Sequence, residues 1–257
     1  MRTTAIMNLK GGTAKTVTAI NAAAILASDF AQRVLLVDAD SQANLTEFVS
    51  FGLPDGIYVG GYADLLRGHK AYTIPTKLRN VSLLPADETL MALDITAADS
   101  GEADPMALAD FLGRNRDRWD RCVIDCPPAF SAGAAAALVA ADEVVIPLKL
   151  DAFGVRGLAN LIEQINNMRR LNADLEIAGV LPTLCYPTEQ QRQAAEDLRY
   201  NLTNLGIRMF HPIHRSPKID EMTFAQKPIT EFSPRCAPAK DYRLFVRSLM
   251  QAEGGED

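Results

Sequence analysis

The chain has 257 residues, of which 48% are hydrophobic and 23% are charged, and its formal net charge is −6. This composition is that of an ordinary globular protein, and the acidic balance argues against wholesale nucleic-acid binding. No apolar run reaches the ~18–20 residues of a membrane helix, and the N-terminus lacks the apolar core of a signal peptide. We therefore expect a cytoplasmic protein that does not engage a membrane.

The cysteines and histidines show no spacing typical of a metal site. The cysteines are Cys122, Cys126, Cys185 and Cys236. Because no two of them form a C-x-x-C pair, neither a zinc site nor a disulfide framework is predicted, and each is interpreted as a reduced thiol. The histidines are His69, His211 and His214. No metal-ligand arrangement of these histidines with cysteines or acids is expected, and none is assigned a catalytic role.

The first predicted strand and helix enclose a glycine-containing turn. A short apolar strand from Thr4 to Met7 precedes the turn, and a helix from Lys15 to Ala31 follows it. In this architecture the backbone N–H groups of the turn and of the first helical turn point at an anion. The sequence therefore predicts a phosphate-binding loop.

The residue types in this loop suit a nucleoside triphosphate with Mg²⁺. Gly11 and Gly12 let the backbone approach an anion without an intervening Cβ. The Lys15 ammonium supplies charge to the β- and γ-phosphates, and the Thr16 hydroxyl can ligate Mg²⁺. The predicted nucleotide contacts in the loop are Lys10, Gly11, Gly12, Thr13, Ala14, Lys15, Thr16 and Val17.

The loop departs from the common pattern G-x-x-x-x-G-K-[ST], because Leu9 and Ala14 stand at its two glycine positions. It fits K-G-G-x-x-K-T instead, with Lys10 as an additional lysine. This pattern resembles the deviant Walker-A loop of the ParA/MinD superfamily of ATPases. Because Ala14 places a Cβ at the second glycine position, we expect hydrolysis of ATP to be slow.

The next predicted strand runs from Arg33 to Asp38 and opens into Asp38-Ala39-Asp40-Ser41-Gln42. A buried parallel strand that ends in an acid is typical of a strand whose carboxyl end faces a ligand. The segment resembles the D-x-D-x-Q segment of ParA-type proteins. The resemblance implies that Asp40 positions or activates the attacking water and that Asp38 supports the hydration shell of Mg²⁺.

A third motif begins at Arg121 and reads Arg-Cys-Val-Ile-Asp-Cys-Pro-Pro. An apolar strand ending in an acid is the Walker-B arrangement, in which Asp125 would hold a water of the Mg²⁺ shell. Pro127 and Pro128 end the strand, because they cannot donate to a ladder. The D-C-P-P of the ParA/MinD superfamily is matched residue for residue.

Strands alternate with helices along the rest of the chain. Strands are expected at 81–85, 142–148, 177–183 and 208–213, helices at 62–67, 87–98, 104–118, 131–141, 151–171, 188–205 and 239–250, and a surface connection at 51–61. The alternation predicts an α/β fold with a predominantly parallel sheet of about seven or eight strands and helices on both faces. We expect a single P-loop domain over residues 1–257, without a separate N-terminal DNA-binding domain.

The segment from Ile213 to Glu221 resembles the family segment I-P-R-N-x-R-L-S-E, with His214 in place of its proline. The resemblance implies that the backbone of Pro212 and Ile213 frames the adenine. It also implies that a basic residue, here Lys218, contributes to DNA binding.

A modest basic excess surrounds that segment. Between Tyr186 and Met250 the chain has ten Lys and Arg residues against seven Asp and Glu residues. This excess is compatible with a basic face, and Arg192 and Arg199 join Lys218 as candidate DNA contacts.

The resemblance to ParA/Soj-type partition ATPases covers essentially residues 1–250. It implies a sandwich dimer formed with ATP and Mg²⁺, in which Lys10 reaches the partner's nucleotide as an arginine finger would. Lys10, Lys15 and Asp40 would then be the catalytic residues. The dimer would bind double-stranded DNA non-specifically on the nucleoid, and a ParB-like partner would stimulate the hydrolysis that resets the monomer.

Other functions share parts of this pattern. A MinD-like positioning ATPase needs a basic amphipathic C-terminal helix, whereas residues 251–257 are acidic and contain glycine. An Fe–S protein needs paired ligand cysteines, and a polysaccharide-export tyrosine kinase needs a tyrosine-rich tail; neither is present. A P-loop amide ligase or synthetase stays open, because it has the same fold.

Overall fold

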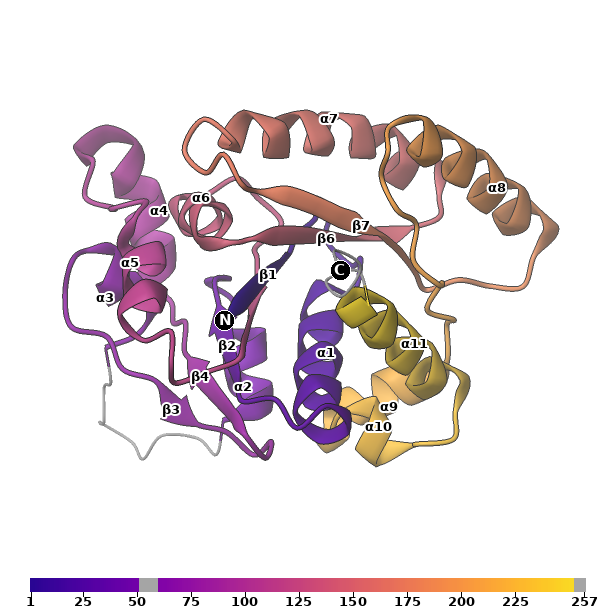
Figure 1. Cartoon of the computed structure of the whole chain (residues 1–257), viewed down its shortest axis with the longest axis horizontal. Coiled ribbons are helices and arrows are strands. Elements are labelled where there is room, and N and C mark those ends of the chain that lie inside the picture. The colour runs from indigo at the N-terminus through magenta and orange to yellow at the C-terminus, as the bar shows by residue number, and fades with distance from the viewer. Residues whose placement is uncertain (51–59, 252–257) are drawn as a thin grey trace.

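The computed structural model describes residues 1–50 and 60–251, without the side chains of residues 96–100, 152 and 153. Its strands are β1 (Arg2–Ile6), β2 (Val34–Asp38), β3 (Ile74–Pro75), β4 (Val81–Leu84), β5 (Arg121–Asp125), β6 (Glu143–Lys149) and β7 (Glu176–Thr183). Within these described ranges they form one seven-stranded sheet in the order β3-β4-β2-β5-β1-β6-β7 (Figure 1). Every neighbouring pair is parallel except β3 and β4. The predicted α/β fold is confirmed.

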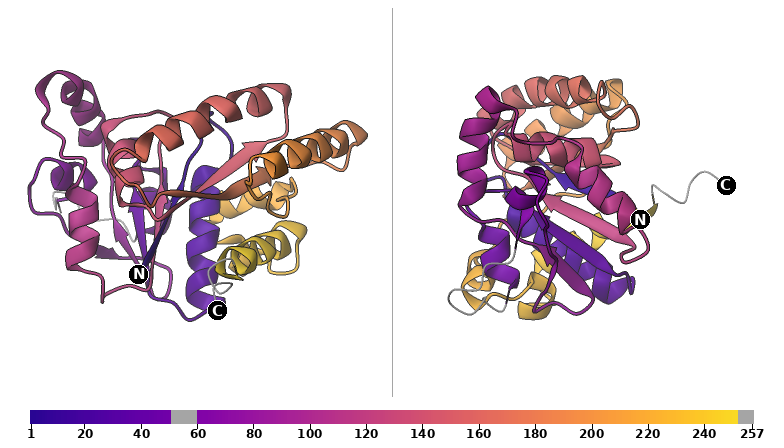
Figure 2. Two further views of the ribbon diagram at one scale, coloured as in Figure 1. Left: turned by 45° about the horizontal axis from the view of Figure 1, so that its top comes forward. Right: turned by 90° about the vertical axis from the view of Figure 1, so that its left-hand side faces the viewer.

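Helices cover both faces of the twisted sheet (Figures 1 and 2). They are α1 (Lys15–Asp29), α2 (Asn44–Val49), α3 (Tyr62–Leu66), α4 (Thr89–Ser100), α5 (Ala107–Arg114), α6 (Ala132–Ala140), α7 (Ala152–Met168), α8 (Glu189–Asn204), α9 (Pro217–Ala225), α10 (Ile229–Phe232) and α11 (Ala237–Gln251). One hydrophobic cluster unites α1, α2 and α9–α11 with the sheet, and a second unites α3–α8 with its other face.

The alternation of side chains along the strands explains the two clusters. In β2, Val34 and Leu36 belong to the α1 side, whereas Leu35 and Val37 belong to the α6 side. All four side chains are fully buried. Because both faces of a parallel sheet are covered, its strands read as continuous apolar runs, and this is why the central strands could be located from the sequence.

The register of the central strands aligns their carboxyl ends. Asp125 at the end of β5 lies beside Ile6 of β1 on one side and beside Asp38 of β2 on the other. The phosphate-loop segment leaves the sheet directly after β1. Three segments that are far apart in the sequence therefore leave the sheet at one edge, where doubly wound folds bind their ligands.

The strand predicted for residues 208–213 is wrong. This segment forms only isolated bridges beside β7, from Met209 to Val180 and from His214 to Cys185. Pro182 in β7 and Pro212 in the segment lack an N–H group, so a continuous ladder cannot form between them. Gly179 lets the segment approach closely, since an added Cβ would lie 2.7 Å from the Arg208 carbonyl oxygen.

Several shorter elements were not expected from the sequence. The antiparallel edge strand β3 has two residues, and α2, α9 and α10 have six, nine and four. The helices predicted at 104–118 and 151–171 are shorter than expected, at α5 and α7. Most of the connection predicted at 51–61 lies outside the described residues.

Candidate functional site

The predicted phosphate-binding segment, residues 7–14, joins β1 to α1 and contains two residues in the left-handed backbone conformation. Gly12 has φ +70°, and Ala14, the residue before α1, has φ 64° and ψ 32°. Glycine adopts this conformation without a steric penalty, whereas in a residue with a Cβ the Cβ crowds the following carbonyl oxygen. The structure thus explains why the common pattern has glycine at the position of Ala14. An added Cβ at Gly11 or Gly12 would meet nothing within 4 Å.

Side chains from both sides hold the loop in place. The Asn8 amide donates to the Pro147 carbonyl oxygen at 2.7 Å, and its Oδ1 accepts from the Lys10 N–H at 2.9 Å. The Thr183 hydroxyl, at the end of β7, donates to the Thr13 carbonyl oxygen at 3.0 Å. The loop is therefore positioned by β6 and β7 as well as by β1.

The two lysines of the loop have different surroundings. Lys15 is buried, and its Nζ lies 3.5 Å from the carbonyl oxygen of Lys10. Burial lowers the pKa of the Lys15 ammonium, although the nearby Asp125 and Asp40 act in the opposite direction. Lys10 is directed elsewhere, since its Nζ lies 2.8 Å from both carboxylate oxygens of Asp151 at the start of α7.

The two strand-end acids are almost completely buried. Burial raises the pKa of the Asp38 carboxyl to about 6, although its hydrogen bonds from Thr46 and from the Asp40 N–H favour ionisation. Burial, and then the charge of Asp38, raise the pKa of Asp125 well above its ordinary value, while Thr16 and Lys15 lower it. Two buried acids on adjacent strands favour a cation between them.

The observed donors fit a Mg²⁺ shell. Asp125 Oδ1 is buried and has no hydrogen-bond partner among the described residues. An orphaned buried carboxylate oxygen is costly unless a cation or an ordered water satisfies it. Asp125, Asp38 and the Thr16 hydroxyl supply the oxygen donors that Mg²⁺ prefers. Asp40 is half-buried, and its Oδ1 accepts only the Gln42 N–H among the hydrogen bonds of the described chain.

Two hollows flank the loop. One, of about 430 Å³, lies between Gly12, Ala14 and Val17 on one side and Leu184, Tyr186 and Arg215 on the other. The other, of about 330 Å³, lies between α1, α2 and α9 and includes Thr16.

The sequence interpretation missed the far wall of the larger hollow. Leu184 and Tyr186 follow β7 and belong to no motif, whereas Arg215 lies in the family segment 213–221 but was not assigned to this wall. Pro212, predicted to frame the adenine, lines a neighbouring hollow that shares Tyr186. Ile213 is buried, and its N–H donates to the Pro182 carbonyl oxygen at 2.8 Å.

Comparison with known protein sequences identifies the family. The family model described as an AAA domain (AAA_31) matches residues 1–177. The chromosome-partitioning ATPase Soj of Treponema pallidum (strain Nichols) is 31% identical over 258 residues, which cover 98% of each protein. The chain belongs to the AAA_31 family of ParA/MinD-type ATPases. Nucleotide hydrolysis is the general activity of this family.

Solved structures resemble this ParA/MinD-type chain over its whole length. A single-residue variant of McdA of Cyanothece, in a complex with ATP, has a TM-score of 0.84 at 24% identity, and the match covers 100% of this chain and 98% of that one. Cobyrinic acid a,c-diamide synthase from Mycobacterium smegmatis, with bound ADP and magnesium, has a TM-score of 0.81 at 27% identity, with coverage of 100% and 97%. ATP or ADP, and in the synthase magnesium, are therefore bound by proteins of this fold.

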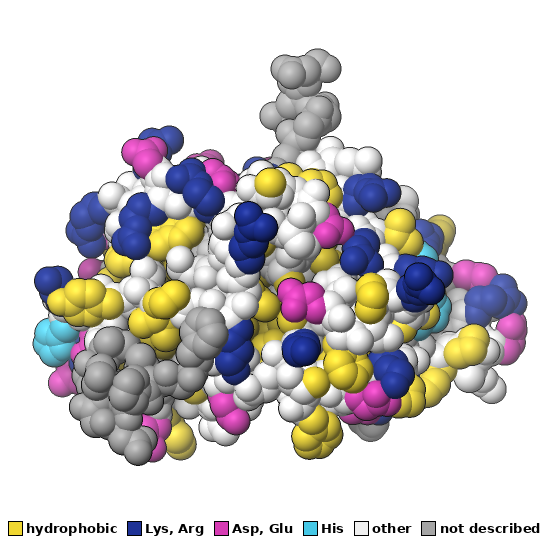
Figure 3. Space-filling view, turned by 90° about the horizontal axis from the view of Figure 1, so that it is seen from below, with side chains coloured by type: hydrophobic (Ala, Val, Ile, Leu, Met, Phe, Trp, Pro, Cys, Tyr) yellow, Lys and Arg dark blue, Asp and Glu magenta, His cyan; other side chains and the backbone are white. Residues whose placement is uncertain are grey.

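The candidate DNA contacts of this family member lie on two helices and are largely paired with acids. Arg192 on α8 pairs with Glu189 and Glu196, and Lys218 on α9 pairs with Glu221 at 2.6 Å. Arg199 is exposed on α8. On the face seen in Figure 3, Lys and Arg side chains are interspersed with acidic and hydrophobic ones. The assignment of these residues to DNA stays a prediction.

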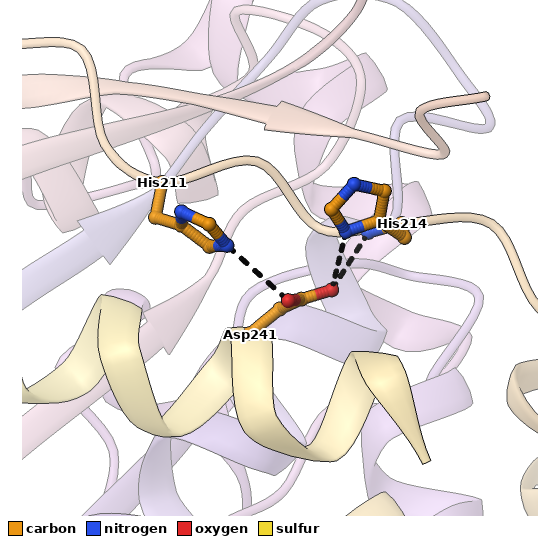
Figure 4. A group of neighbouring side chains, drawn as sticks. All are labelled: His211, His214 and Asp241. Carbon is orange, nitrogen blue, oxygen red and sulfur yellow. Dashed lines mark hydrogen bonds and ion pairs between the residues drawn. The ribbon is translucent and has the colours of Figure 1, made fainter. Parts of the chain in front are cut away.

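The interpretation that the histidines have no metal-ligand arrangement with acids is wrong, because ligand atoms of His211, His214 and Asp241 all lie within 4.8 Å of one another. His211 Nε2 lies 3.3 Å from Asp241 Oδ1, and His214 Nδ1 lies 2.9 Å from Asp241 Oδ2 (Figure 4). The three residues, here named the His–Asp cluster, are brought together because the bridged segment passes over the start of α11. Their spacing in the sequence gives no sign of this contact.

Among the helices of the described chain, none has both the length and the apolar character needed to cross a lipid bilayer. Most of the acidic C-terminal end, residues 252–257, lies outside the described residues.

Proposed function

We propose that the chain is an ATP-dependent partition ATPase of ParA type, slow in turnover, acting as one P-loop domain over residues 1–257. With ATP it would form a homodimer that binds double-stranded DNA without sequence preference. A ParB-like partner would stimulate hydrolysis and return the protein to the monomer. Curated relatives of nearly equal length support this assignment, because they are named as chromosome-partitioning proteins.

The observation that carries the proposal is that the two loop lysines lie in different surroundings. Lys15 is buried beneath the loop beside Asp125, as a lysine for the β- and γ-phosphates should be. Lys10 points out of the loop to the carboxylate of Asp151. Its side chain is 36% exposed, so a partner's phosphate could replace Asp151 without disturbing the core.

The remaining groups have roles that follow from their positions. Thr16, Asp38 and Asp125 would hold the Mg²⁺ shell, and Asp40 would orient the attacking water. When bound, Mg²⁺ would neutralise charge that develops on the phosphates. Lys10 of one protomer, held near the phosphate bound by the other, would stabilise the charge of the transition state, and the monomer lacks this contact. Contacts of this class accelerate hydrolysis by ~10³–10⁵. ATP binding and dimer formation would therefore favour one another.

Binding to random-sequence duplex DNA tests the proposal. Binding would be measured with ATP, with ADP and without nucleotide, over a series of salt concentrations. Lys10→Ala and Lys15→Ala would be compared with Lys70→Ala, which removes an exposed lysine that stacks on Tyr72. We expect binding only with ATP, a steep loss with salt, and loss in the two loop variants but not in Lys70→Ala. ATP binding together with indifference to DNA at every salt concentration would contradict the proposal.

An amide ligase or synthetase is the second candidate, favoured by the likeness to the cobyrinic acid a,c-diamide synthase. Its signature would be ATP turnover that depends on a small carboxylic acid and an amine donor and that ignores DNA. Phosphate release would be measured with and without such acids. A MinD-like function would instead give ATP-dependent binding to anionic vesicles.

A further inference from the structure

The His–Asp cluster flanks Pro212 and Ile213, and none of its three residues is assigned a role in the proposed ATPase. His211 and His214 belong to the segment beside β7, and Asp241 belongs to α11. Figure 4 shows both imidazole rings, which come from the segment, directed at the one carboxylate that comes from the helix. We propose that these three residues bind a divalent transition-metal ion, with Zn²⁺ as the best fit.

The donor set matches the chemistry of zinc. Two imidazole nitrogens and one carboxylate oxygen are ligands typical of Zn²⁺, and such sites keep a fourth position open for water. The three donor groups offer atoms that all lie within 4.8 Å of one another. Ligands of a tetrahedral Zn²⁺ lie ~3.3 Å apart. His211 Nε2 lies 3.3 Å from Asp241 Oδ1, and His214 Nδ1 lies 2.9 Å from Asp241 Oδ2, so each imidazole is already within that range of one oxygen of the carboxylate.

The carboxylate is held in place for such a role. Asp241 is 5% exposed, and its Oδ2 also accepts the backbone N–H of His214 at 3.0 Å. A fixed orientation of this kind lowers the cost of assembling a metal site, because the ligand does not have to be ordered on binding. A bound ion would replace the hydrogen bonds that now join each imidazole to the carboxylate.

The site is open to solvent. The side chains of His211 and His214 are 44% and 42% exposed. His214 also lines the hollow of about 380 Å³ that contains Tyr186 and Pro212. Arg215, the next residue, is paired with Asp220 at 2.8 Å. An ion could therefore enter from solvent, and a water could complete its coordination.

Occupancy would tie the segment beside β7 to α11. One residue beyond Asp241, the buried Tyr242 forms a hydrogen bond of 3.3 Å with Thr18 on α1, the helix that follows the phosphate loop. The ion would thus fix the segment against a helix that packs directly on α1. Occupancy of the site should therefore be detectable as a rise in thermal stability, a measurement that does not depend on ATP turnover.

Calorimetric titration of the nucleotide-free, chelator-treated chain with Zn²⁺ tests the proposal. His211→Ala and His214→Ala remove half-exposed rings, so the fold should tolerate both changes. His69→Ala is the matched control, because His69 is exposed and lies 3.7 Å from Asp64 but has no second histidine beside it. We expect one Zn²⁺ per chain with an accompanying rise in thermal stability, affinity at least ~10-fold weaker in each cluster variant, and no change in His69→Ala.

Substitution of Co²⁺ for Zn²⁺ separates this site from the thiols. The expected spectrum has ligand-field bands of a nitrogen and oxygen site without thiolate charge-transfer absorption. Absence of Zn²⁺ binding, binding that survives both His211→Ala and His214→Ala, or thiolate absorption would each overturn the proposal. Each outcome is independent of whether the chain binds DNA.

Discussion

At the scale of single residues, Ala14 is the clearest departure from the usual phosphate loop. Its left-handed backbone carries a Cβ in a conformation that costs roughly 1–2 kcal/mol for an L-residue. Ala31, just beyond α1, has a similar φ of 55° and is exposed. The two alanines therefore form a matched pair, one inside the candidate site and one outside it.

We expect Ala14→Gly and Ala31→Gly each to stabilise the fold. Relief of the strained φ, less the extra backbone entropy of glycine, should give about 1 kcal/mol, or about 2–4 °C in Tm. Only Ala14→Gly should also raise ATP turnover, because only this change relaxes the phosphate loop. Thermal unfolding and phosphate release check both parts. Equal turnover in the two variants would show that the Ala14 Cβ does not limit hydrolysis.

The buried acids predict how stability depends on pH when no nucleotide is bound. The pKa of Asp38 is about 6 in the fold, against 3.8 ordinarily. Between these values the folded chain retains a proton that the unfolded chain has lost, so stability falls as pH rises from about 4 to above 6. The difference corresponds to at most about 3 kcal/mol. The raised pKa of Asp125 acts in the same direction.

Asp38→Asn should flatten this pH dependence and weaken Mg²⁺-dependent nucleotide binding. Urea unfolding at a series of pH values measures the slope, which is more informative than the absolute stability because Asn cannot replace every hydrogen bond of Asp38. Asp120→Asn is the contrasting variant. In the wild-type chain Arg33 lowers the pKa of Asp120 to about 2, so Asp120 contributes stability that is lost as pH falls below about 4. An unchanged slope above pH 4 in Asp38→Asn would contradict the assignment.

The loop residues could be predicted because phosphate binding imposes a contiguous pattern on the chain. The structure places Lys15 and Thr16 beside Asp125, and their roles toward phosphate and Mg²⁺ stay predictions. Residues that contribute through tertiary contact could not be predicted in this way. Asp151 meets Lys10 across 141 positions, and Asp241 meets His214 across 27. A local sequence pattern cannot predict contacts between residues so far apart in the sequence.

At the scale of secondary structure, α7 begins with a residue that performs two functions. Asp151 Oδ1 accepts the Gly154 N–H at 2.8 Å and so caps the helix. The same carboxylate binds Lys10, and this contact lowers the pKa of Asp151. In the monomer the start of α7 therefore competes with any phosphate for Lys10.

Asp151→Asn should release Lys10 while keeping the cap, since asparagine caps helices as well as aspartate does. Loss of a partly exposed ion pair of ~0.2–1 kcal/mol in each of the two protomers should favour the ATP-dependent dimer up to about 30-fold. Light scattering over a range of protein concentrations measures this shift. The gain should vanish in the double variant Lys10→Ala/Asp151→Asn. A gain that persists there would assign the effect to something other than Lys10.

The long elements were predictable and the short ones were not. Strands β1, β2, β4, β5, β6 and β7 lie within two residues of the predicted starts and ends. Strand β3 has two residues and ends in Pro75, which leaves no room for an alternating pattern. The segment 208–213 is apolar enough to resemble a strand, but two prolines break its pairing with β7.

At the scale of the whole molecule, the strand order decides the function that can be proposed. Neighbouring β2, β5 and β1 deliver Asp38, Asp125 and the phosphate loop to one edge of the sheet. The sequence predicted this edge because the strand ends carry the acids. It could not predict the wall formed by Leu184, Tyr186 and Arg215, which depends on how the segment after β7 folds back.

Sedimentation velocity with ATP and Mg²⁺, with ADP, and without nucleotide tests the central claim most directly. We predict a dimer only with ATP for the wild-type chain. Lys10→Ala should still bind ATP and remain a monomer, whereas Lys15→Ala should lose ATP binding itself. A wild-type chain that stays monomeric with ATP, or a Lys10→Ala variant that dimerises as readily as wild type, would contradict the account.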